Sequence, residues 1–493
     1  MATPIPPNQA LFTAWSAAAA CQGRVVRALG EESVAVGITT DSRALTPGGA
    51  FVALRGQRSD GHTYLAEAQA RGAALLVVEE GAAVPPGPAA VVAVRDTLEA
   101  WGALARAHLR EWRRERGDGR VVAITGSAGK TTTKELTALL LAAAGPTLAT
   151  AGNLNNRIGL PAMAFTATVH HRFLVLEAGM SLRGEIAALA AIAEPDVGVI
   201  VNVSLAHAEG VGGTRADVAR EKGSLYEALD RAGVAIVNAD DAAARGQLAR
   251  SAARAALRFG RGEDAHYRLA EREVLPGGGS RLLVLRRAPR SEFPERLSLE
   301  LPYPGEAAAL DLLAALAAAD AAAGEALPLD TVRSALATLP ALAGRAHVRR
   351  AASGLLVVDD SYNANPASMA AALASLREIA GPSRRLVAVL GEMKELGEVA
   401  EREHEHLGRA AADAGVALLI TCGGLSHLTA REARAHGVTV EACETASAAA
   451  AWAAAHLEAG DAVLVKASRS VGAELVVSAL LARHGDAKGE CPP

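Results

Sequence analysis

RVVAITGSAGKTTTKEL, residues 120–136, is the stretch around which the rest of the chain is organised. Its opening VVAIT is a short apolar, β-branched run of the kind that forms a buried parallel strand. Gly126 and Gly129 follow, then Lys130 and Thr131, and then a helix-forming run. This order is typical of a loop that wraps a nucleoside triphosphate, because N–H groups at the helix start and the helix dipole both favour phosphate.

The loop departs from the common P-loop spacing, which places a glycine five residues before the Gly-Lys pair. That position here is Ile124, so a glycine-rich strand-to-helix turn without a ligand is the alternative interpretation. If the loop binds ATP, Lys130 lies on the outer phosphates and the Thr131 hydroxyl on Mg²⁺. The predicted ATP contacts in this stretch are Gly126, Ser127, Ala128, Gly129, Lys130, Thr131 and Thr132.

Lysine is rare in this chain. Of the fifty basic residues only six are lysine, at positions 130, 134, 222, 394, 466 and 488. Arginine has therefore taken over most positions where any surface charge suffices. Where lysine remains, we expect that its compact ammonium or its amine chemistry is required, since arginine replaces neither.

Composition sets the broad class. With 493 residues the chain is too long for one core, and two to four domains are expected. Half of the residues are apolar but only 3% are aromatic, so the cores must be built from Ala, Leu and Val. A net charge of −4 and a pI near 6.4 give no reason to expect a nucleic-acid or membrane partner.

Three observations favour a cytoplasmic protein without a membrane span. The cysteines show no metal or CxxC spacing and are expected to be free thiols: Cys21, Cys422, Cys443 and Cys491. Residues 1–8 carry three prolines and no basic residue, unlike a signal peptide, and a first helix is expected to end near Cys21. Asp311 and Asp320 interrupt the Ala-rich run 307–323, which favours a buried soluble helix.

Polar groups follow successive strands in the first two-thirds of the chain. Residues 34–94 indicate a small α/β unit, and 97–116 a helix that leads into the nucleotide strand. HRFLVLE ends on Glu177, and DVGVIVNVSLAH places His207 just past another strand. Because ligands sit beyond the carboxyl ends of strands in an open α/β sheet, we expect Thr131, Glu177 and His207 to converge on one crevice.

Two loops and an edge ribbon complete this part. AGNLNNRIGLP, residues 151–161, is predicted to be a loop whose amide groups suit a polar substrate, with a plain surface loop as the alternative. Ser42 and Arg43 lie on a polar loop for which a solvated turn is the alternative. Short strands between 261 and 301 indicate a β-ribbon at the edge of the sheet, and we place a domain boundary at Arg345.

The last unit alternates strands and helices, which predicts a parallel, doubly wound sheet. Asp359 and Asp360 end an apolar strand, where carboxylates are costly unless exposed or paired. The motif DDSYNANP, which begins with these two aspartates, leads into a helix, so its amide side chains can face the same kind of crevice.

Taken together, the motifs resemble those of the Mur ligases. They occur in the same order as in that family and extend over nearly the whole chain. The words that carry the resemblance are TTDSR with DGH, TGSAGKTTTKE, GNLNNRIGLP, LEAG, NVSLAH, REKGSL, DDSYNANPASM, LGEMKELG with His404, and LVKASR. The resemblance implies an α/β fold of three domains. These are a uridine-nucleotide domain at 1–97, a central P-loop domain with a parallel sheet at 98–345, and a Rossmann-like doubly wound domain at 346–493.

The resemblance also implies a reaction, in which ATP phosphorylates a peptide carboxylate and an amine attacks the acyl phosphate to form an amide. The implied catalytic residues are Lys130, Glu177, His207 and Lys222. Thr131 and Glu177 are implied to hold one Mg²⁺, and His207 and Lys222, the latter as its CO₂ adduct, a second. Arg345 and Asp360 are implied to reach ATP from the third domain. The implied substrate contacts are Ser42, Arg43, Asn153, Asn155, Asn156, Tyr362, Asn363, Asn365 and Pro366.

GNLNN and DDSYNANP are the most specific motifs, because sister ligases have different sequences at these positions. They imply the substrates UDP-MurNAc-tripeptide and D-Ala-D-Ala, with the third peptide residue (diaminopimelate or lysine) left open. A monomer is expected, although no motif determines the oligomeric state. The alternatives are a sister ligase that adds a diamino acid to the dipeptide stage, a P-loop ATPase, and a degenerate homologue that only binds. GEAAALD at 305–311 lacks the family's usual asparagines, so the adenine contact is either absent or replaced by Asp311.

Overall fold

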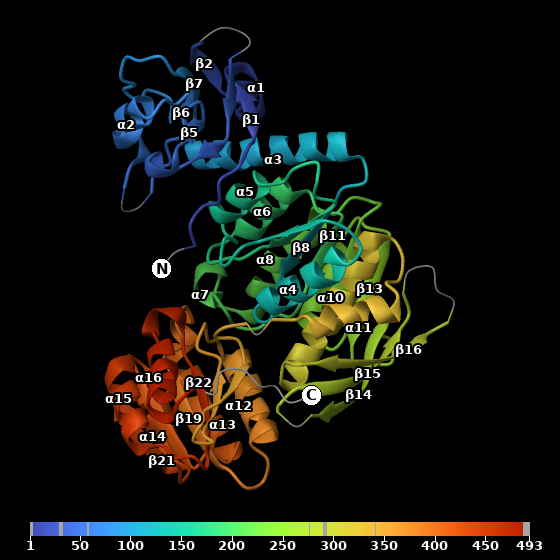
Figure 1. Cartoon of the computed structure of the whole chain (residues 1–493), viewed down its shortest axis with the longest axis vertical. Helices are drawn as coiled ribbons and strands as arrows, with labels where there is room; N and C mark the ends of the chain where they lie inside the picture. The colour runs from blue at the N-terminus through green and yellow to red at the C-terminus, as the bar shows by residue number, and fades with distance from the viewer. Residues whose placement is uncertain are drawn as a thin grey trace.

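The computed structural model describes residues 3–28, 33–56, 59–275, 277–288, 293–340 and 342–486. Lys488 and Cys491 therefore lie outside the described residues. Three sheet-containing units follow one another along the long axis of the molecule, from the N-terminal unit through the central one to the C-terminal one (Figure 1). Each main sheet falls within one of the three ranges predicted for domains, and the α/β class is confirmed.

The N-terminal unit is a five-stranded sheet in the order β2-β7-β6-β5-β4, beside a β1–β3 ribbon. Strands β4 to β7 are parallel, and β2 pairs antiparallel with β7. Its elements are β1 (Leu11–Thr13), α1 (Ala14–Cys21), β2 (Arg24–Arg27), β3 (Val34–Val36), β4 (Ile38–Thr39), β5 (Ala50–Val52), α2 (Leu65–Ala70), β6 (Leu75–Glu79) and β7 (Ala90–Val94). The expected first helix does end at Cys21.

Helix α3 (Thr97–Arg116) joins the N-terminal unit to the central one, and its predicted bounds are confirmed. Asp96 caps its start by accepting the N–H groups of Leu98 and Glu99. The Trp101 ring packs 4.7 Å from that of Phe165, centroid to centroid. One hydrophobic cluster continues from the N-terminal sheet through α3 into the central unit, so these two units share a core.

The central unit contains a nine-stranded sheet in the order β16-β15-β14-β13-β12-β11-β8-β10-β9. Strands β8 to β14 are parallel, whereas β15 and β16 form the antiparallel edge ribbon that the sequence predicts. The strands are β8 (Arg120–Thr125), β9 (Thr147–Ala149), β10 (Phe173–Glu177), β11 (Val197–Ile200), β12 (Val234–Asn238), β13 (Ala255–Gly260), β14 (Tyr267–Val274), β15 (Ser280–Arg286) and β16 (Glu295–Leu301).

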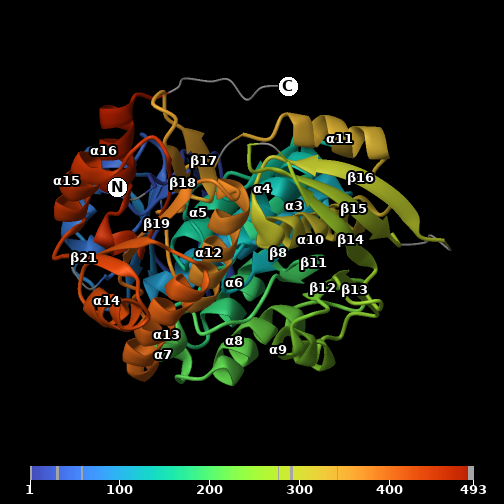
Figure 2. The ribbon, with the colours of Figure 1, turned by 90° about the horizontal axis from the view of Figure 1, so that it is seen from below.

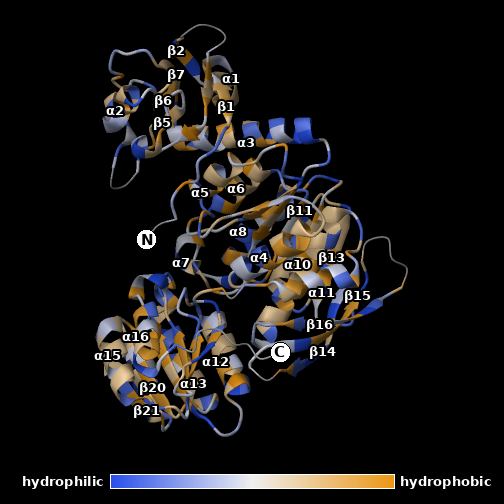
Figure 3. Cartoon of the chain, in the orientation of Figure 1, coloured by the Kyte–Doolittle hydropathy of each residue, from blue (hydrophilic) through white to orange (hydrophobic). Residues whose placement is uncertain are grey.

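Helices cover both faces of this sheet, as a doubly wound fold requires. They are α4 (Lys130–Ala142), α5 (Gly159–Ala164), α6 (Glu185–Ala193), α7 (Ala208–Val211), α8 (Arg215–Glu227), α9 (Ala242–Arg245), α10 (Gly305–Ala323) and α11 (Leu329–Ala337). Helices α4, α10 and α11 share one core cluster, and α3, α5, α6 and α8 belong to the cluster on the other face. The predicted Ala-rich buried helix is α10, which is apolar along most of its length (Figure 3).

The C-terminal unit contains a six-stranded sheet in the order β17-β18-β22-β19-β20-β21, parallel except for β17. Its elements are β17 (His347–Arg350), β18 (Leu356–Asp359), α12 (Pro366–Ala380), β19 (Arg385–Gly391), α13 (Ala400–Asp413), β20 (Leu418–Cys422), α14 (Ser426–Ala435), β21 (Thr439–Cys443), α15 (Ala446–His456), β22 (Asp461–Lys466) and α16 (Glu474–His484). Its two core clusters contain only residues of this unit, one on each face of the sheet.

The C-terminal unit meets the central one along α12, which packs against α10 (Figure 2). Arg272 of β14 and Glu378 of α12 form an ion pair of 2.5 Å across this boundary. None of the described helices combines the length and the apolar character needed to cross a lipid bilayer. The described cysteines, Cys21, Cys422 and Cys443, are free thiols, as the sequence predicts.

The structure corrects the sequence analysis in two respects. Five strands were not anticipated, β1, β2, β9, β13 and β17. The end of the predicted 151–161 loop is helical, because α5 begins at Gly159. Asn156 explains the early helix. Its side-chain oxygen accepts the N–H groups of Ile158 and Gly159, at 3.1 and 2.8 Å, and so satisfies donors at the start of α5.

Trp101 allows a test of the α3 joint. Its side chain is fully buried, and its indole N–H donates to the Ile158 carbonyl at 3.0 Å. Trp101→Ala should lower the free energy of unfolding by about 3–5 kcal/mol, because it leaves a cavity and an unpaired carbonyl. Trp15, which is 54% exposed, is the matched control, and Trp15→Ala should change stability by less than about 0.5 kcal/mol. Denaturant titration of both variants measures the difference, and equal losses would contradict the shared core.

Candidate active site

The site lies where the order of the central strands reverses. Strand β8 is the first strand of the central sheet along the chain. The next two strands in sequence, β9 and β10, lie on one side of β8, and β11 lies on the other side. This leaves a crevice beyond the carboxyl ends of the strands, and the 126–129 loop opens into it. Gly129 has φ +79°, and a Cβ there would lie 2.2 Å from an oxygen of Asp311, so glycine is needed for both conformation and space.

The loop after β11 holds the glycine-rich loop in place. The Asn202 amide accepts the Ala128 N–H at 2.9 Å and donates to the Ala128 carbonyl at 3.1 Å. The Ser127 hydroxyl accepts the Ser204 N–H at 2.8 Å. Lys130 lies back over the loop, with Nζ donating to the Gly126 carbonyl at 2.8 Å. The loop is thus preorganised, with its helix N-terminus facing the crevice.

Glu177 links three segments at the end of β10. It is 2% exposed, and its two carboxylate oxygens accept from Thr131 Oγ1 at 2.9 Å and from Asn155 Nδ2 at 2.7 Å. Its backbone N–H donates to Thr150 Oγ1 at 2.9 Å. Lys134, a lysine from the glycine-loop helix, donates to the Thr150 carbonyl at 2.6 Å and so secures the start of the 151–158 loop.

Burial lowers the pKa of two lysines in the central unit, Lys130 in the crevice and Lys222 outside its lining. Loss of hydration on burial lowers the pKa of Lys130, Glu177 raises it, and Arg345 lowers it again. Burial lowers the pKa of Lys222 well below its usual value, and the charge of Lys130 adds to this effect. The carboxylate of Glu221 opposes these two effects on the pKa of Lys222, whose side chain is 1% exposed. Buried groups with strongly shifted pKa values are concentrated at functional sites.

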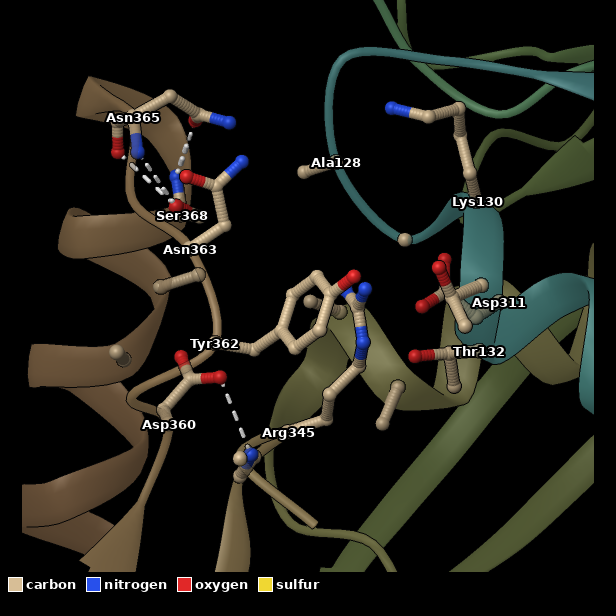
Figure 4. A pocket seen from close by; sticks show the side chains of 18 of the residues that line it. Ala128, Lys130, Thr132, Asp311, Arg345, Asp360, Tyr362, Asn363, Asn365 and Ser368 are labelled. Carbon is tan, nitrogen blue, oxygen red and sulfur yellow. Dashed lines mark hydrogen bonds between the residues drawn. The ribbon is translucent and has the colours of Figure 1, made fainter. Parts of the chain in front are cut away.

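The C-terminal unit supplies the opposite wall of the pocket, as Figure 4 shows. Asn365 caps α12 by accepting the Ser368 N–H at 2.9 Å, and its Nδ2 donates across the boundary to the Ser127 carbonyl at 3.1 Å. The Arg345 guanidinium stacks 4.2 Å from the centre of the Tyr362 ring. The enclosed volume is about 280 Å³, close to the lower end of the usual range for small-molecule sites.

Asp360 is held on two sides in this wall. One oxygen accepts from Lys466 Nζ at 2.5 Å, and the other accepts the Ala346 N–H at 3.1 Å. Lys466 is 3% exposed and also donates to the Asn363 carbonyl at 2.9 Å. The sequence analysis named neither Lys466 nor Asn202 as a site residue, although Lys466 is one of the six lysines kept in an arginine-rich chain.

The structure brings most of the predicted site residues together. Those that line the pocket are Ser127, Ala128, Gly129, Lys130, Thr131, Thr132, Asn153, Asn155, Glu177, Arg345, Asp360, Tyr362, Asn363 and Asn365. Those that do not line it are Ser42, Arg43, Gly126, Asn156, His207, Lys222 and Pro366.

The residues outside the pocket have other surroundings. In the N-terminal unit the Ser42 hydroxyl donates to Glu67 at 3.1 Å, and Arg43 pairs with Asp41 at 2.7 Å. His207 precedes α7, and its Nδ1 contacts a carboxylate oxygen of Glu395 from the C-terminal unit. The structure shows no direct contact between the side chains of His207 and Glu177 among the described residues, so Thr131 and Glu177 meet directly and His207 does not join them.

The donor set of the crevice suits a hard cation. No group of three His, Cys, Asp or Glu side chains that could hold a metal occurs among the described residues. The Thr131 hydroxyl and the Glu177 carboxylate, in contact at the helix start, instead offer two oxygen ligands beside the place where phosphates would lie. Mg²⁺ typically binds through one or two protein oxygens together with substrate phosphates and water. The residues present therefore fit Mg²⁺.

Comparisons with known proteins identify the family. Three family models match: the Mur ligase middle domain over residues 124–319, the Mur ligase glutamate ligase domain over 344–469, and the Mur ligase family catalytic domain over 35–109. A relative from Escherichia coli is 37% identical over 79% of this chain and 82% of its own length. The chain belongs to the Mur ligase family, which confirms the resemblance seen in the sequence.

The names of the relatives are more specific than the name of the family. The Escherichia coli protein, and one from Mycobacterium tuberculosis that is 36% identical over 90% of this chain and 91% of its own length, are both named UDP-N-acetylmuramoyl-tripeptide–D-alanyl-D-alanine ligase. A crystal structure of MurF from Acinetobacter baumannii has a TM-score of 0.83 at 30% identity, and covers 97% of this chain and 100% of its own. MurF from Thermotoga maritima, in complex with ADP, has a TM-score of 0.78 at 29% identity, over 90% and 97%.

We expect Asp311, which lies beside the glycine-rich loop, to make nucleotide binding dependent on pH. Burial raises the pKa of its carboxyl well above the usual value, although Thr133 and Arg345 oppose the shift. A polyphosphate in the pocket would raise this pKa further, so binding takes up a proton and the affinity for Mg-ADP should fall as pH rises above the pKa of the free protein.

Calorimetric titration with Mg-ADP across the range of pH in which the protein stays folded measures this effect, which can reach about tenfold per pH unit for one proton. Asp311→Asn should bind with nearly constant affinity over the same range. Asp330→Asn, whose side chain is 97% exposed, is the matched control and should behave as the unchanged protein does. A flat profile for the unchanged protein would refute the prediction.

Proposed function

We propose that this protein is an ATP-dependent ligase that joins D-alanyl-D-alanine to UDP-N-acetylmuramoyl-tripeptide, giving the pentapeptide precursor of peptidoglycan. Relatives of this name align with most of the chain. The observation that carries the proposal is the bond from Asn155 to Glu177. It fastens GNLNN, the loop most specific for this member of the family, to the carboxylate that also holds Thr131 of the nucleotide helix.

The reaction consists of two displacements. An oxygen of the terminal tripeptide carboxylate attacks the γ-phosphorus of ATP, and ADP leaves. The amine nitrogen of D-Ala-D-Ala then attacks the acyl carbon, loses a proton, and inorganic phosphate departs with its C–O electron pair. Negative charge accumulates on phosphate oxygens in both steps, so fixed positive charge lowers both barriers.

The residues of the crevice supply this charge and hold the reactants. Lys130 and the N–H groups of the 126–132 loop bind the outer phosphates. Arg345, at the boundary with the third domain, and Asp360 of the third domain position ATP. Thr131 and Glu177 hold Mg²⁺, which when bound neutralises phosphate charge. Asp311 lies beside the loop as the candidate contact for the adenine or the phosphates. Asn202 and Lys134 act indirectly, by keeping the two loops in place.

Lys222 serves as a carbamate that, with His207, binds a second Mg²⁺. Only a neutral amine adds to CO₂, and burial beside Lys130 favours the neutral form. The addition forms an N–C bond and releases a proton, which turns the amine into an anionic oxygen ligand suited to a hard cation. Arginine cannot undergo this reaction, which accounts for a lysine at this position.

The three domains divide the substrates among them. The N-terminal domain, residues 1–97, binds the uridine nucleotide near Ser42 and Arg43, the central domain (98–345) binds ATP, and the third (346–493) binds the dipeptide. Asn153, Asn156, Tyr362, Asn363, Asn365 and Pro366 lie on the two loops assigned to the peptide substrates. Closure of the third domain over the crevice excludes water, which would hydrolyse the acyl phosphate. All these residues come from one chain, which supports a monomer, and the free thiols support a cytoplasmic location.

Substrate dependence tests the function. Release of phosphate from ATP should require both UDP-MurNAc-tripeptide and D-Ala-D-Ala, because the acyl phosphate forms only on the acceptor and turns over only with an amine. A coupled phosphate assay with each substrate omitted in turn measures this. Activity with a single amino acid on the dipeptide-stage acceptor would favour a sister ligase, and substrate-independent turnover a simple ATPase.

Substitutions of Lys222 distinguish a carbamate at this position from an ordinary lysine. Lys222→Ala should lower kcat by at least about 100-fold, since a ligand to the metal is lost, and added short carboxylates should restore part of it. Lys222→Arg keeps the charge but not the chemistry and should remain inactive. The initial rate with and without bicarbonate provides the measurement, and full activity of Lys222→Arg would exclude the carbamate.

A further inference from the structure

The loop between β19 and α13, residues 392–399, reaches from the third domain to the central one, which it contacts at His207. Glu395 contacts His207 Nδ1 through a carboxylate oxygen. Two residues further on, a Cβ on Gly397 would lie 3.1 Å from the Cβ of Glu209, so the backbones of the two domains also approach closely here. This contact lies outside the nucleotide pocket, and the function proposed above assigns no role to Glu395.

Both partners of this contact have an unfavourable backbone. His207 has φ +59° and Glu395 φ +62°, in the left-handed region that residues other than glycine rarely adopt. The described residues include five such non-glycine positions, and three of them, His207, Ala346 and Glu395, lie at the boundary between the central and third domains. Strain of this kind persists where surrounding contacts impose it, and it is concentrated at functional sites.

The third domain holds the loop at the two residues that precede Glu395, Met393 and Lys394. His404 is fully buried, and its Nε2 accepts the Met393 N–H at 3.0 Å while Nδ1 donates to the Ala400 carbonyl at 2.7 Å. The Lys394 N–H donates to Ser468 Oγ at 2.9 Å. His404 and Ser468, which belong to the LGEMKELG and LVKASR motifs, therefore have structural roles: they fix the backbone from which Glu395 projects.

We propose that Glu395 is a positioning residue that orients His207 when the third domain closes. A carboxylate on Nδ1 fixes the tautomer of the imidazole and leaves Nε2 as the nitrogen free to bind a cation, the arrangement that metal-binding histidines commonly use. Domain closure thereby completes the second metal site, in addition to excluding water. This inference rests on the proposed function, in which His207 is a ligand of that site.

The variants at Glu395 separate orientation from simple tethering. Glu395→Ala should weaken the binding of Mn²⁺, used as a probe for Mg²⁺ in the presence of ADP and the acceptor, by about 10- to 100-fold. Glu395→Gln retains an oxygen acceptor, so its affinity for Mn²⁺ should lie between that of Glu395→Ala and that of the unchanged protein. The control is Glu398→Ala on the same loop, an exposed residue with no described side-chain partner, which should leave Mn²⁺ affinity unchanged.

The decisive measurement is a double-mutant cycle on Mn²⁺ affinity. If Glu395 acts through His207, then Glu395→Ala should have no further effect in a His207→Ala background. Additive losses, or unchanged affinity in Glu395→Ala alone, would overturn the proposal. In steady-state assays kcat should fall while the KM for ATP stays nearly constant, because the glycine-rich loop is untouched. Failure of the unchanged protein to ligate D-Ala-D-Ala would refute the function instead, and the metal titration does not depend on turnover.

Discussion

The buried carboxylate of Glu177 is the group on which the arrangement of the crevice depends. A carboxylate that is 2% exposed is costly unless its oxygens are paired. Thr131 and Asn155 satisfy one oxygen each, and thereby fix the start of α4 and the 151–158 loop relative to β10. The same carboxylate faces Lys130, whose pKa it raises. One negative charge thus aligns the nucleotide loop, the central strand and the loop assigned to the acceptor.

The sequence predicts the parts of the molecule whose local chemistry is distinctive. Helix α3, with an aspartate cap and a glycine end, and the strand before Gly126 were predicted with nearly correct bounds. The meeting of Thr131 and Glu177 was expected because they lie at the carboxyl ends of two neighbouring parallel strands, β8 and β10, although the same argument also placed His207 beside them. Motif resemblance added residues such as Lys222, for which a lone lysine in a helix offers no local signal.

Other features depend on contacts that no local pattern contains. Strand β17 forms because it pairs with β18 at an edge, and the amide of Asn156 starts α5 earlier than periodicity suggests. The placement of His207 against Glu395 depends on how two domains dock, across 188 positions of sequence. Asp311 is similar, since only the close approach of α10 to Gly129 reveals what its carboxyl faces.

The continuous core through α3 has a further consequence for the choice of acceptor. The N-terminal and central units share one hydrophobic cluster, whereas the third unit has clusters of its own. The first two units therefore pack as one body, whereas the third unit is joined to the central one by contacts between domains such as Asn365–Ser127 and Arg272–Glu378. In the proposed function the first unit holds the uridine nucleotide and the second holds ATP, so the shared core sets the distance between the two sites. We therefore expect that a peptide of the correct length brings its terminal carboxylate to the γ-phosphate and that a shorter one does not reach it.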